Sequence, residues 1–199
     1  MVVGVAGKYC AGKSTVTELL VQAGYEVIDV DRLGHEALSR RVADIRATFG
    51  ETYVSPDGSV DRKRLGSLVF SDAAELRRLE AIVHPEMKKM VRERLAGPGA
   101  AGSNTGPGPR GTVINAALLF EMGLDELCDT ILWVTAPVFT RMWRARRRDG
   151  LSATEILKRF WTQRTLRPQP SAPDVDIHTV ENHGALDSLR SQLERLSLL

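Results

Sequence analysis

The stretch Gly7-Lys8-Tyr9-Cys10-Ala11-Gly12-Lys13-Ser14 decides how the rest of the chain is interpreted. It follows a short apolar, β-branched run from Val2 to Ala6 and precedes a helical pattern that runs from Lys13 to about Ala23 and stops at Gly24. A strand, a loop with the spacing G-x-x-x-x-G-K-S and a helix direct backbone N–H groups into a concavity at a helix N-terminus, which favours a polyphosphate. We therefore predict a nucleotide site here.

Different residues of this loop are expected to bind different parts of a nucleotide. Lys13 is expected to neutralise the β- and γ-phosphate oxygens of ATP, and the Ser14 hydroxyl is expected to ligate Mg²⁺. Thr15 is placed to help at the α-phosphate. ATP and Mg²⁺ are the expected cofactors, and the predicted binding residues are Gly7, Lys8, Cys10, Ala11, Gly12, Lys13, Ser14 and Thr15.

Further strands predict the fold class. A second buried-type strand runs from Val27 into Asp29 and Asp31, and core strands are also expected at 112–116, 130–134 and 177–180. The pattern predicts an α/β protein with a P-loop NTPase core, in which a five-stranded parallel sheet is flanked by helices. A C-terminal helix is expected to cap this sheet with a stripe of leucines: Leu186, Leu189, Leu193 and Leu196.

The remaining segments are assigned around this core as parts of one 199-residue domain. We expect a P-loop core formed by residues 1–31, 112–136 and 166–199, a helical substrate-binding region at 32–96, a flexible Gly/Pro loop at 97–111 and a helical lid at 137–165. The turn residues Ser55-Pro56-Asp57-Gly58 interrupt the helical region.

Composition narrows the class of partners. The 27 Lys and Arg residues nearly balance 25 Asp and Glu residues, so the net charge of +2 does not imply nucleic acid. No apolar run approaches the roughly 18 residues of a membrane span. With only Cys10 and Cys128 present, and with Met1 leading directly into a strand, we expect a cytoplasmic protein. Its partners would be small-molecule substrates, and it would be a monomer or a small homo-oligomer.

Two carboxylates are candidates for the acceptor side of a phosphoryl transfer. Asp29 and Asp31 are two apart on the expected strand, so they would share a face at its carboxyl end, where open α/β sheets bind ligands. A carboxylate that orients the acceptor hydroxyl and takes its proton is a recurrent part of this chemistry. We predict that Asp31 is this base, supported by Asp29. The alternative is that Asp31 caps a helix beginning near Arg32.

A cluster of arginines needs its own explanation. Arg141, Arg144 and Arg148 follow i, i+3, i+7 spacing, so they share one helical stripe that suits a phosphate chain, whereas Arg146 and Arg147 point elsewhere. An arginine that stabilises charge in phosphoryl transfer contributes roughly 10³ to 10⁵ in rate. We therefore assign catalytic roles to Arg144 and Lys13 beside Asp31.

A second helix would complete the lid. Ser152 and Glu155 form a capping-box pattern, which predicts a helical hairpin that closes over the site. The alternative is a solvated basic helix or a patch for an anionic polymer. A nucleic-acid module is rejected because stacking aromatics are not interleaved with the arginines, and Trp143 and Trp161 are expected to be packing residues.

Several short motifs occur in a characteristic order. After the glycine loop come Ile28-Asp29-Val30-Asp31 with His35, Asp57-Gly58-Ser59-Val60-Asp61-Arg62 with Leu65, Val69-Phe70, Leu79-Glu80-Ala81-Ile82-Val83-His84-Pro85, Leu118-Leu119-Phe120-Glu121, the arginine segment and Asn182-His183-Gly184. In this order they resemble the dephospho-CoA kinase family. The resemblance covers nearly the whole chain apart from the Gly/Pro loop.

The resemblance implies transfer of the ATP γ-phosphoryl group to the ribose 3′-hydroxyl of dephospho-CoA, the last step of coenzyme A synthesis. Asp31 matches the family's proposed base, Arg144 and Arg148 match lid positions, and Asn182 matches the adenine side. The substrate-binding residues implied are Asp29, Asp31, His35, Arg62 and His84. A buried structural role for His84, and a pairing of Arg62 with Asp61, remain open.

The chain also departs from the family pattern. Lys8 and Cys10 stand where glycine is usual, Asn115 and Ala117 stand where relatives often carry an acid and a proline, and Arg141 replaces a residue that is usually uncharged. Two other functions therefore stay open. One is a kinase for another small acceptor, such as a nucleoside monophosphate, and the other is a non-catalytic nucleotide-binding regulator.

Overall fold

The computed structural model describes residues 1–97, 109–149, 160, 163, 166–171 and 175–199. The chain divides into two compact units, one formed by Met1–Asp29 with Leu95–Leu199 and the other by Val30–Arg94. Most of the predicted Gly/Pro loop, and Ser152, Glu155 and Trp161 of the predicted second lid helix, lie outside the described residues.

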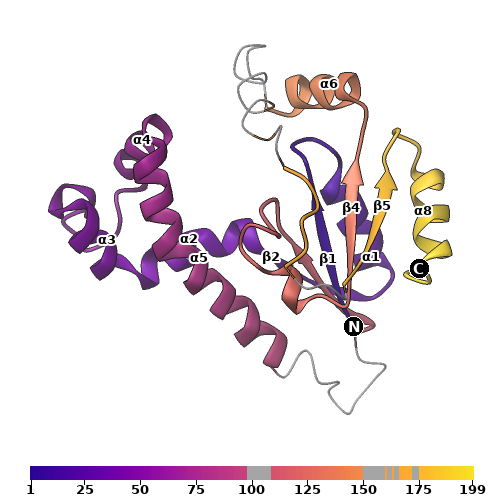
Figure 1. Ribbon diagram of the computed structural model, residues 1–199, viewed down its shortest axis with the longest axis horizontal. Helices are drawn as coiled ribbons and strands as arrows, with labels where there is room; N and C mark the ends of the chain where they lie inside the picture. Colours follow the sequence, from indigo (N-terminus) through magenta and orange to yellow (C-terminus); the bar gives the residue numbers. More distant parts are fainter. Residues whose placement is uncertain (98–108, 150–159, 161–162, 164–165, 172–174) are drawn as a thin grey trace. The chain divides into compact units, whose positions relative to one another are not determined.

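The larger unit is built on a parallel sheet (Figure 1). Its strands are β1 (Val2–Gly7), β2 (Tyr25–Asp29), β3 (Gly111–Asn115), β4 (Thr130–Thr135) and β5 (Asp176–Glu181). They pair in parallel in the order β2-β3-β1-β4-β5. The prediction of a five-stranded parallel sheet is confirmed, and the glycine loop follows the central strand.

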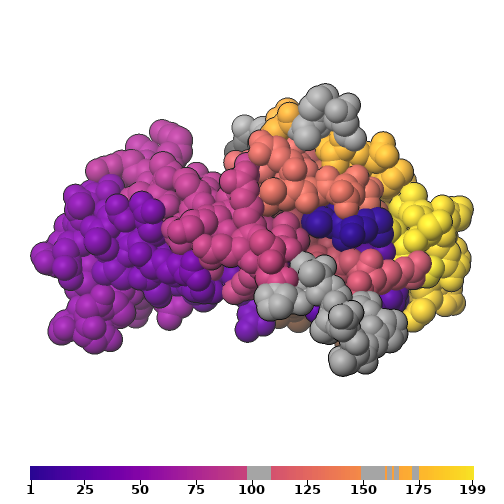
Figure 2. Space-filling view, turned by 90° about the horizontal axis from the view of Figure 1, so that it is seen from below, coloured from indigo at the N-terminus to yellow at the C-terminus, as the bar shows by residue number. Residues whose placement is uncertain are grey.

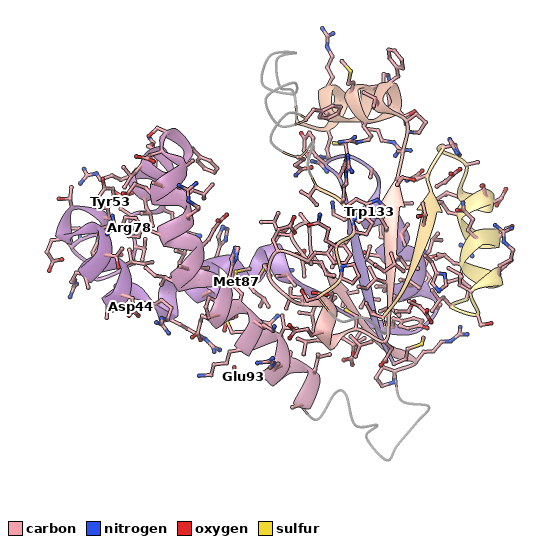
Figure 3. The ribbon with its side chains drawn as sticks, viewed as in Figure 1. Asp44, Tyr53, Arg78, Met87, Glu93 and Trp133 are labelled. Carbon is pink, nitrogen blue, oxygen red and sulfur yellow. The ribbon has the colours of Figure 1, made fainter. Side chains whose placement is uncertain are left out.

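Helices on the sheet supply the main core. Val3 and Val5 of β1 are fully buried among residues from α1 (Lys13–Gln22) and α8 (Leu186–Arg195). Trp133 of β4, labelled in Figure 3, packs against Phe120 with ring centroids 6.0 Å apart. Seen from below, the indigo N-terminal end of the chain reaches the surface between atoms of later parts of the chain (Figure 2).

The predicted leucine stripe on α8 is only partly correct. Leu189 and Leu193 are buried in the core of the sheet unit, and Leu196 packs against it. Leu186 is 54% exposed, so its predicted place in the cap is wrong. It is the first residue of α8, and the first turn of this helix extends beyond the core.

The boundary after β2 also differs from the prediction. β2 ends at Asp29, and helix α2 (Val30–Arg40) begins at once, so Asp31 lies in the first helical turn and not on the strand. The reason is the helical spacing of Val30, Leu33 and Ala37, which are all buried and form one apolar stripe. The prediction that Asp29 and Asp31 share a face of a strand is therefore wrong.

The smaller unit is helical. It contains α2, α3 (Val42–Phe49), the short 3-10 helix η1 (Glu51–Tyr53), α4 (Arg62–Ser71) and most of α5 (Ala73–Ala96). A β-bridge between Val54 and Val60 closes the predicted turn. Asp61 caps α4 by accepting a hydrogen bond of 3.0 Å from the Arg64 backbone N–H. A small core holds these elements together: Ile45, Val60, Leu65 and Val69.

Ion pairs and an aromatic cluster add to this small core. Arg40 of α2 contacts Glu36 at 2.8 Å, Glu86 at 3.5 Å and Glu93 at 3.1 Å, and the last two belong to α5. Tyr53 lies edge-on to Phe49, and the Arg78 guanidinium lies over the same Phe49 ring at 5.5 Å (Figure 3). These contacts add to the apolar core of the unit.

Helix α6 (Val138–Asp149) follows β4 closely. In Figure 1 it lies across the sheet unit beyond the arrowheads of the strands. This is also the end of the sheet from which the glycine loop emerges, because β1 is parallel to β4. The arginines of α6 and the glycine loop therefore meet within one unit.

Candidate active site

The glycine loop has backbone angles that restrict its sequence. Gly7 and Gly12 have φ of 150° and 102°. A Cβ on Gly7 would lie 2.3 Å from the Val134 carbonyl oxygen, and a Cβ on Gly12 would lie 1.9 Å from Asn182 Nδ2. Both positions therefore require glycine. Cys10 has φ of 59°, a left-handed conformation that non-glycine residues adopt at a cost.

The loop leads into the N-terminus of α1. Gly12 is the N-cap residue and supplies no side-chain cap, so the first N–H groups of the helix are left for another acceptor. The Lys13 ammonium donates a hydrogen bond of 2.8 Å to the Gly7 carbonyl, which holds this charge over the loop. Ser14 is exposed on the same turn. A helix N-terminus beside a cation is suited to bind an anion such as phosphate.

A buried network supports the loop at Ala11. The Ala11 carbonyl accepts hydrogen bonds from Arg144 Nη1 at 3.2 Å and from Asn182 Nδ2 at 3.1 Å. Asn182 Oδ1 accepts in turn from Arg144 Nη2 at 2.9 Å and from the Gly184 backbone N–H at 3.1 Å. Asn182 is 3% exposed. Residues predicted from widely separated segments thus meet at one carbonyl.

A second set of contacts holds Tyr9. Its carbonyl accepts a hydrogen bond of 2.8 Å from Arg141 Nε, and its backbone N–H donates one of 2.6 Å to Gln163 Oε1. The Arg141 side chain is buried and lies over the Phe160 ring at 4.4 Å. Burial lowers the pKa of the Arg141 guanidinium, and interaction with Cys10 partly offsets this effect. Arg148 lies over the Tyr9 ring at 5.4 Å.

The arginine stripe therefore faces the loop. Arg141, Arg144 and Arg148 all contact loop residues, whereas Arg147 lies over Trp143 at 5.3 Å on the outer side. Trp143 is 61% exposed, so the prediction that it is a packing residue is wrong. It stands on the helix face opposite the buried Ala145 and Arg141, where described residues provide no core.

Side-chain oxygen atoms that could ligate a metal ion occur at the carboxyl ends of neighbouring strands. Asp29 ends β2 and is in register with Asn115 of β3, which is in register with Val5 of β1. Among the described residues, nothing donates a hydrogen bond to the buried Asn115 Oδ1. Hydroxyl, carboxylate and amide oxygens are ligands that suit Mg²⁺, so Ser14, Asp29 and Asn115 fit this ion chemically. Within the described ranges, no group of three or more His, Cys, Asp or Glu side chains could hold a metal.

The other predicted acceptor residues belong to the helical unit. Asp31 and His35 are exposed and lie one turn apart on α2. His84 is half-buried on α5, and Arg62 is the exposed first residue of α4. The Asp61 carboxylate lies 3.8 Å from Arg64 Nε and also accepts the hydrogen bond that caps α4. The described contacts of this carboxylate are therefore with Arg64.

Two residues of the site, one in the loop and one that contacts it, were not predicted from the sequence. Tyr9 occupies a variable position of the loop motif, and Gln163 lies 154 residues away from it. No local pattern links them, since their hydrogen bond depends on the folded arrangement of residues far apart in the sequence. The only sequence signal was the arginine stripe, which indicated a helix facing phosphate and not one that holds the loop backbone.

The central glycine loop, the parallel sheet and the arginine helix that contacts the loop define a P-loop kinase. A solved shikimate kinase from Acinetobacter baumannii shares this fold, with a TM-score of 0.52 at 14% identity, covering 99% of this chain and 91% of that one. The chain belongs to the dephospho-CoA kinase family, whose model matches residues 1–186.

Individual relatives support this assignment. The dephospho-CoA kinase of Anaeromyxobacter dehalogenans is 36% identical over 198 residues, which cover 98% of this chain and 90% of the relative. That of Geobacter sulfurreducens is 34% identical, with coverage of 98% and 96%. A solved protein from Thermus thermophilus has a TM-score of 0.74 and 32% identity, covering 99% and 96% of the two chains. The predictions of the family and of an ATP-dependent kinase are confirmed.

A bilayer span requires a longer and more apolar helix than any that the described residues form.

Proposed function

We propose that this chain transfers the γ-phosphoryl group of ATP to the 3′-hydroxyl of the ribose of dephospho-CoA, which gives coenzyme A and ADP. The observation that supports this most is the loop from Gly7 to Ser14. An added Cβ would clash at Gly7 and at Gly12, and arginines of α6 bond the carbonyls of Tyr9 and Ala11. The acceptor is inferred from the dephospho-CoA kinase family, to which the chain belongs.

The nucleotide half of the reaction is assigned to the sheet unit. The backbone N–H groups of the loop and the N-terminus of α1 bind the phosphates, and Lys13 balances the charge on their oxygens. Arg148 stabilises the charge that develops during transfer, and Arg144 is assigned the same role through the N–H groups that it does not use on Ala11 and Asn182. Asn182 contributes to the nucleotide pocket. Ser14 would hold Mg²⁺, supported by Asp29 and Asn115. When bound, this ion neutralises phosphate charge and helps to align the transferred group.

The acceptor half is assigned to residues near the start of the helical unit. Asp31 accepts the proton of the attacking hydroxyl, and Asp29 supports it. His35, Arg62 and His84 bind the acceptor. Phosphoryl transfer demands little covalent help from a protein, so the main task of these side chains is to align the hydroxyl with the γ-phosphate.

An acceptor panel tests the proposal. ADP release would be measured with purified protein and Mg-ATP in the presence of dephospho-CoA, AMP, CMP, pantothenate or no acceptor. We expect only dephospho-CoA to stimulate turnover, and we expect omission of Mg²⁺ to abolish it. Mass spectrometry of the product, with and without a 3′-specific nucleotidase, locates the new phosphate.

Other outcomes would change the assignment. Stimulation by AMP or CMP in place of dephospho-CoA would indicate a nucleoside monophosphate kinase. Tight ATP binding without turnover on any acceptor would indicate a regulator. We also propose a cytoplasmic enzyme that is a monomer or a small homo-oligomer, and size-exclusion chromatography with light scattering measures that state.

A further inference from the structure

The arginine contacts bear on the direction of the loop's N–H groups. In a trans peptide the C=O and the N–H of the same plane point in opposite directions. No cis peptide occurs among the described residues. Arg141 Nε bonds the Tyr9 carbonyl at 2.8 Å, and Arg144 Nη1 bonds the Ala11 carbonyl at 3.2 Å. The N–H groups in these two planes belong to Cys10 and Gly12, and they therefore point away from α6.

We propose that Arg141 is a positioning residue for nucleotide phosphate: by holding the Tyr9 carbonyl on the outer side of the loop, it directs the Cys10 N–H toward the bound polyphosphate. The inference deepens the proposed function and rests on it. Arg144 and Asn182 hold the Ala11 carbonyl in the same way, which fixes the Ala11–Gly12 peptide plane. Arg141 itself is placed to touch the backbone of the loop, so it is not a catalytic residue.

The packing around Arg141 keeps its side chain in one position. Its side chain is only 7% exposed and lies over Phe160, and the neighbouring Ala145 and Cys10 form a small apolar cluster with Tyr9, Met142 and Phe160. A buried guanidinium has no solvent to compete for its donors, so its hydrogen bond to a carbonyl is strong and directional. A solvated basic helix would not bury one arginine in this way.

The backbone of the loop explains why such a holding group is useful. Cys10 has a φ of 59°, and the left-handed region costs a residue with a Cβ roughly 1–2 kcal/mol. Without an external contact, the Tyr9–Cys10 peptide plane would relieve this strain by rotating. Its carbonyl is held by Arg141, and the preceding N–H of Tyr9 is held by Gln163 at 2.6 Å. The Tyr9 N–H belongs to the preceding Lys8–Tyr9 plane, so two consecutive peptide planes of the loop are each held by one contact.

The test compares Arg141→Met with a matched variant on the same helix. Arg146→Met removes the same charge from an exposed position of α6 that the structure gives no loop contact. For Arg141→Met we expect the KM for ATP and the Kd for Mg-ADP to rise about tenfold, which corresponds to about 1.4 kcal/mol. The KM for dephospho-CoA should stay within about twofold and kcat within about threefold, because N–H contacts made equally in ground and transition states affect binding and not chemistry.

A second readout follows the N–H group itself. In ¹⁵N-labelled wild-type protein, the Cys10 amide signal should move strongly on addition of Mg-ADP, and in Arg141→Met this shift should shrink. Arg141→Lys keeps a donor of similar reach, so it should recover part of the ADP affinity. The lysine variant also serves as the test if the methionine variant fails to fold.

The outcomes separate this inference from the proposed function. If wild-type protein does not bind Mg-ADP, the proposed function itself fails. If wild-type and Arg146→Met proteins bind Mg-ADP and both Arg141 variants bind it equally well, the inference is overturned and Arg141 has only a packing role. A lower melting temperature of the Arg141 variants with unchanged KM for ATP would overturn it in the same way.

Discussion

The two units of this chain are stabilised in different ways, and the difference follows their assigned tasks. In the sheet unit, the glycine loop is supported by a buried amide, Asn182, and by guanidinium groups that bond backbone carbonyls. In the helical unit, Arg40 of α2 pairs with the buried Glu86 and the exposed Glu93 of α5, and Asp31 and His35 are exposed.

This contrast indicates where rigidity is needed. Phosphate binding by backbone N–H groups requires fixed peptide planes, and buried hydrogen bonds provide them. In the helical unit an apolar core holds the helices together, and the exposed ion pairs add only roughly 0–1 kcal/mol each. We infer that the nucleotide cradle is preformed, whereas the acceptor residues are aligned mainly by the substrate that they bind.

The largest effect is expected in the cradle. Lys13→Ala removes the ammonium that balances phosphate charge, so kcat should fall by about 10³-fold. Steady-state ADP release with dephospho-CoA measures it. Lys63→Ala, an exposed lysine of α4, is the matched control and should retain full turnover. A loss of less than tenfold in Lys13→Ala would show that the loop does not hold the reacting phosphates.

Core truncations compare the two units directly. Leu20 is fully buried in the sheet unit and Leu65 is 1% exposed in the helical unit. Each leucine-to-alanine change should cost about 3 kcal/mol. Hydrogen exchange should show that Leu65→Ala loosens α4 while the amides of β1 and β4 keep their protection. Equal loss of protection in both units would contradict their description as separate compact units.

Gly12→Ala tests the close approach within the cradle. A Cβ there meets Asn182 Nδ2 at 1.9 Å and the backbone has φ of 102°, so we expect a loss of about 2 kcal/mol, or about 30-fold, in affinity for Mg-ADP. Gly58→Ala is the control, because Gly58 has φ of 82° but nothing within 4 Å of an added Cβ. Calorimetric titration measures both variants. Similar affinities would mean that the contact with Asn182 does not shape the loop.

The smallest effect concerns the thiol of Cys128, which precedes β4. Burial, and then Asp125 and Asp129, raise the pKa of Cys128 to about 12. In a Cys10→Ala background, Cys128 should therefore resist Ellman's reagent at pH 8 until urea unfolds the chain. Because the folded pKa lies above the ordinary value, the stabilising contribution of this thiol is complete below pH 9 and declines as pH rises toward 12. Rapid labelling of folded protein would contradict the burial of this thiol.

The sequence predicted local features well. The loop from Gly7 to Ser14 and the parallel sheet were predictable because each depends on a short pattern of glycines or β-branched residues. The helical start at Val30 was not, since the burial of Val30 depends on packing that a short apolar run does not reveal. The hydrogen bond between Tyr9 and Gln163 joins residues 154 apart, so only the folded chain shows it.

The division of labour between the two units is the central claim, and Asp31→Asn tests it most directly. ATP affinity and single-turnover phosphoryl transfer to dephospho-CoA would be measured on the same protein sample. We predict that Asp31→Asn binds Mg-ATP within about twofold of wild type, while transfer slows by roughly 10²- to 10⁴-fold because the base is lost. Transfer at the wild-type rate would contradict the account, as would a loss of ATP affinity equal to the loss of rate.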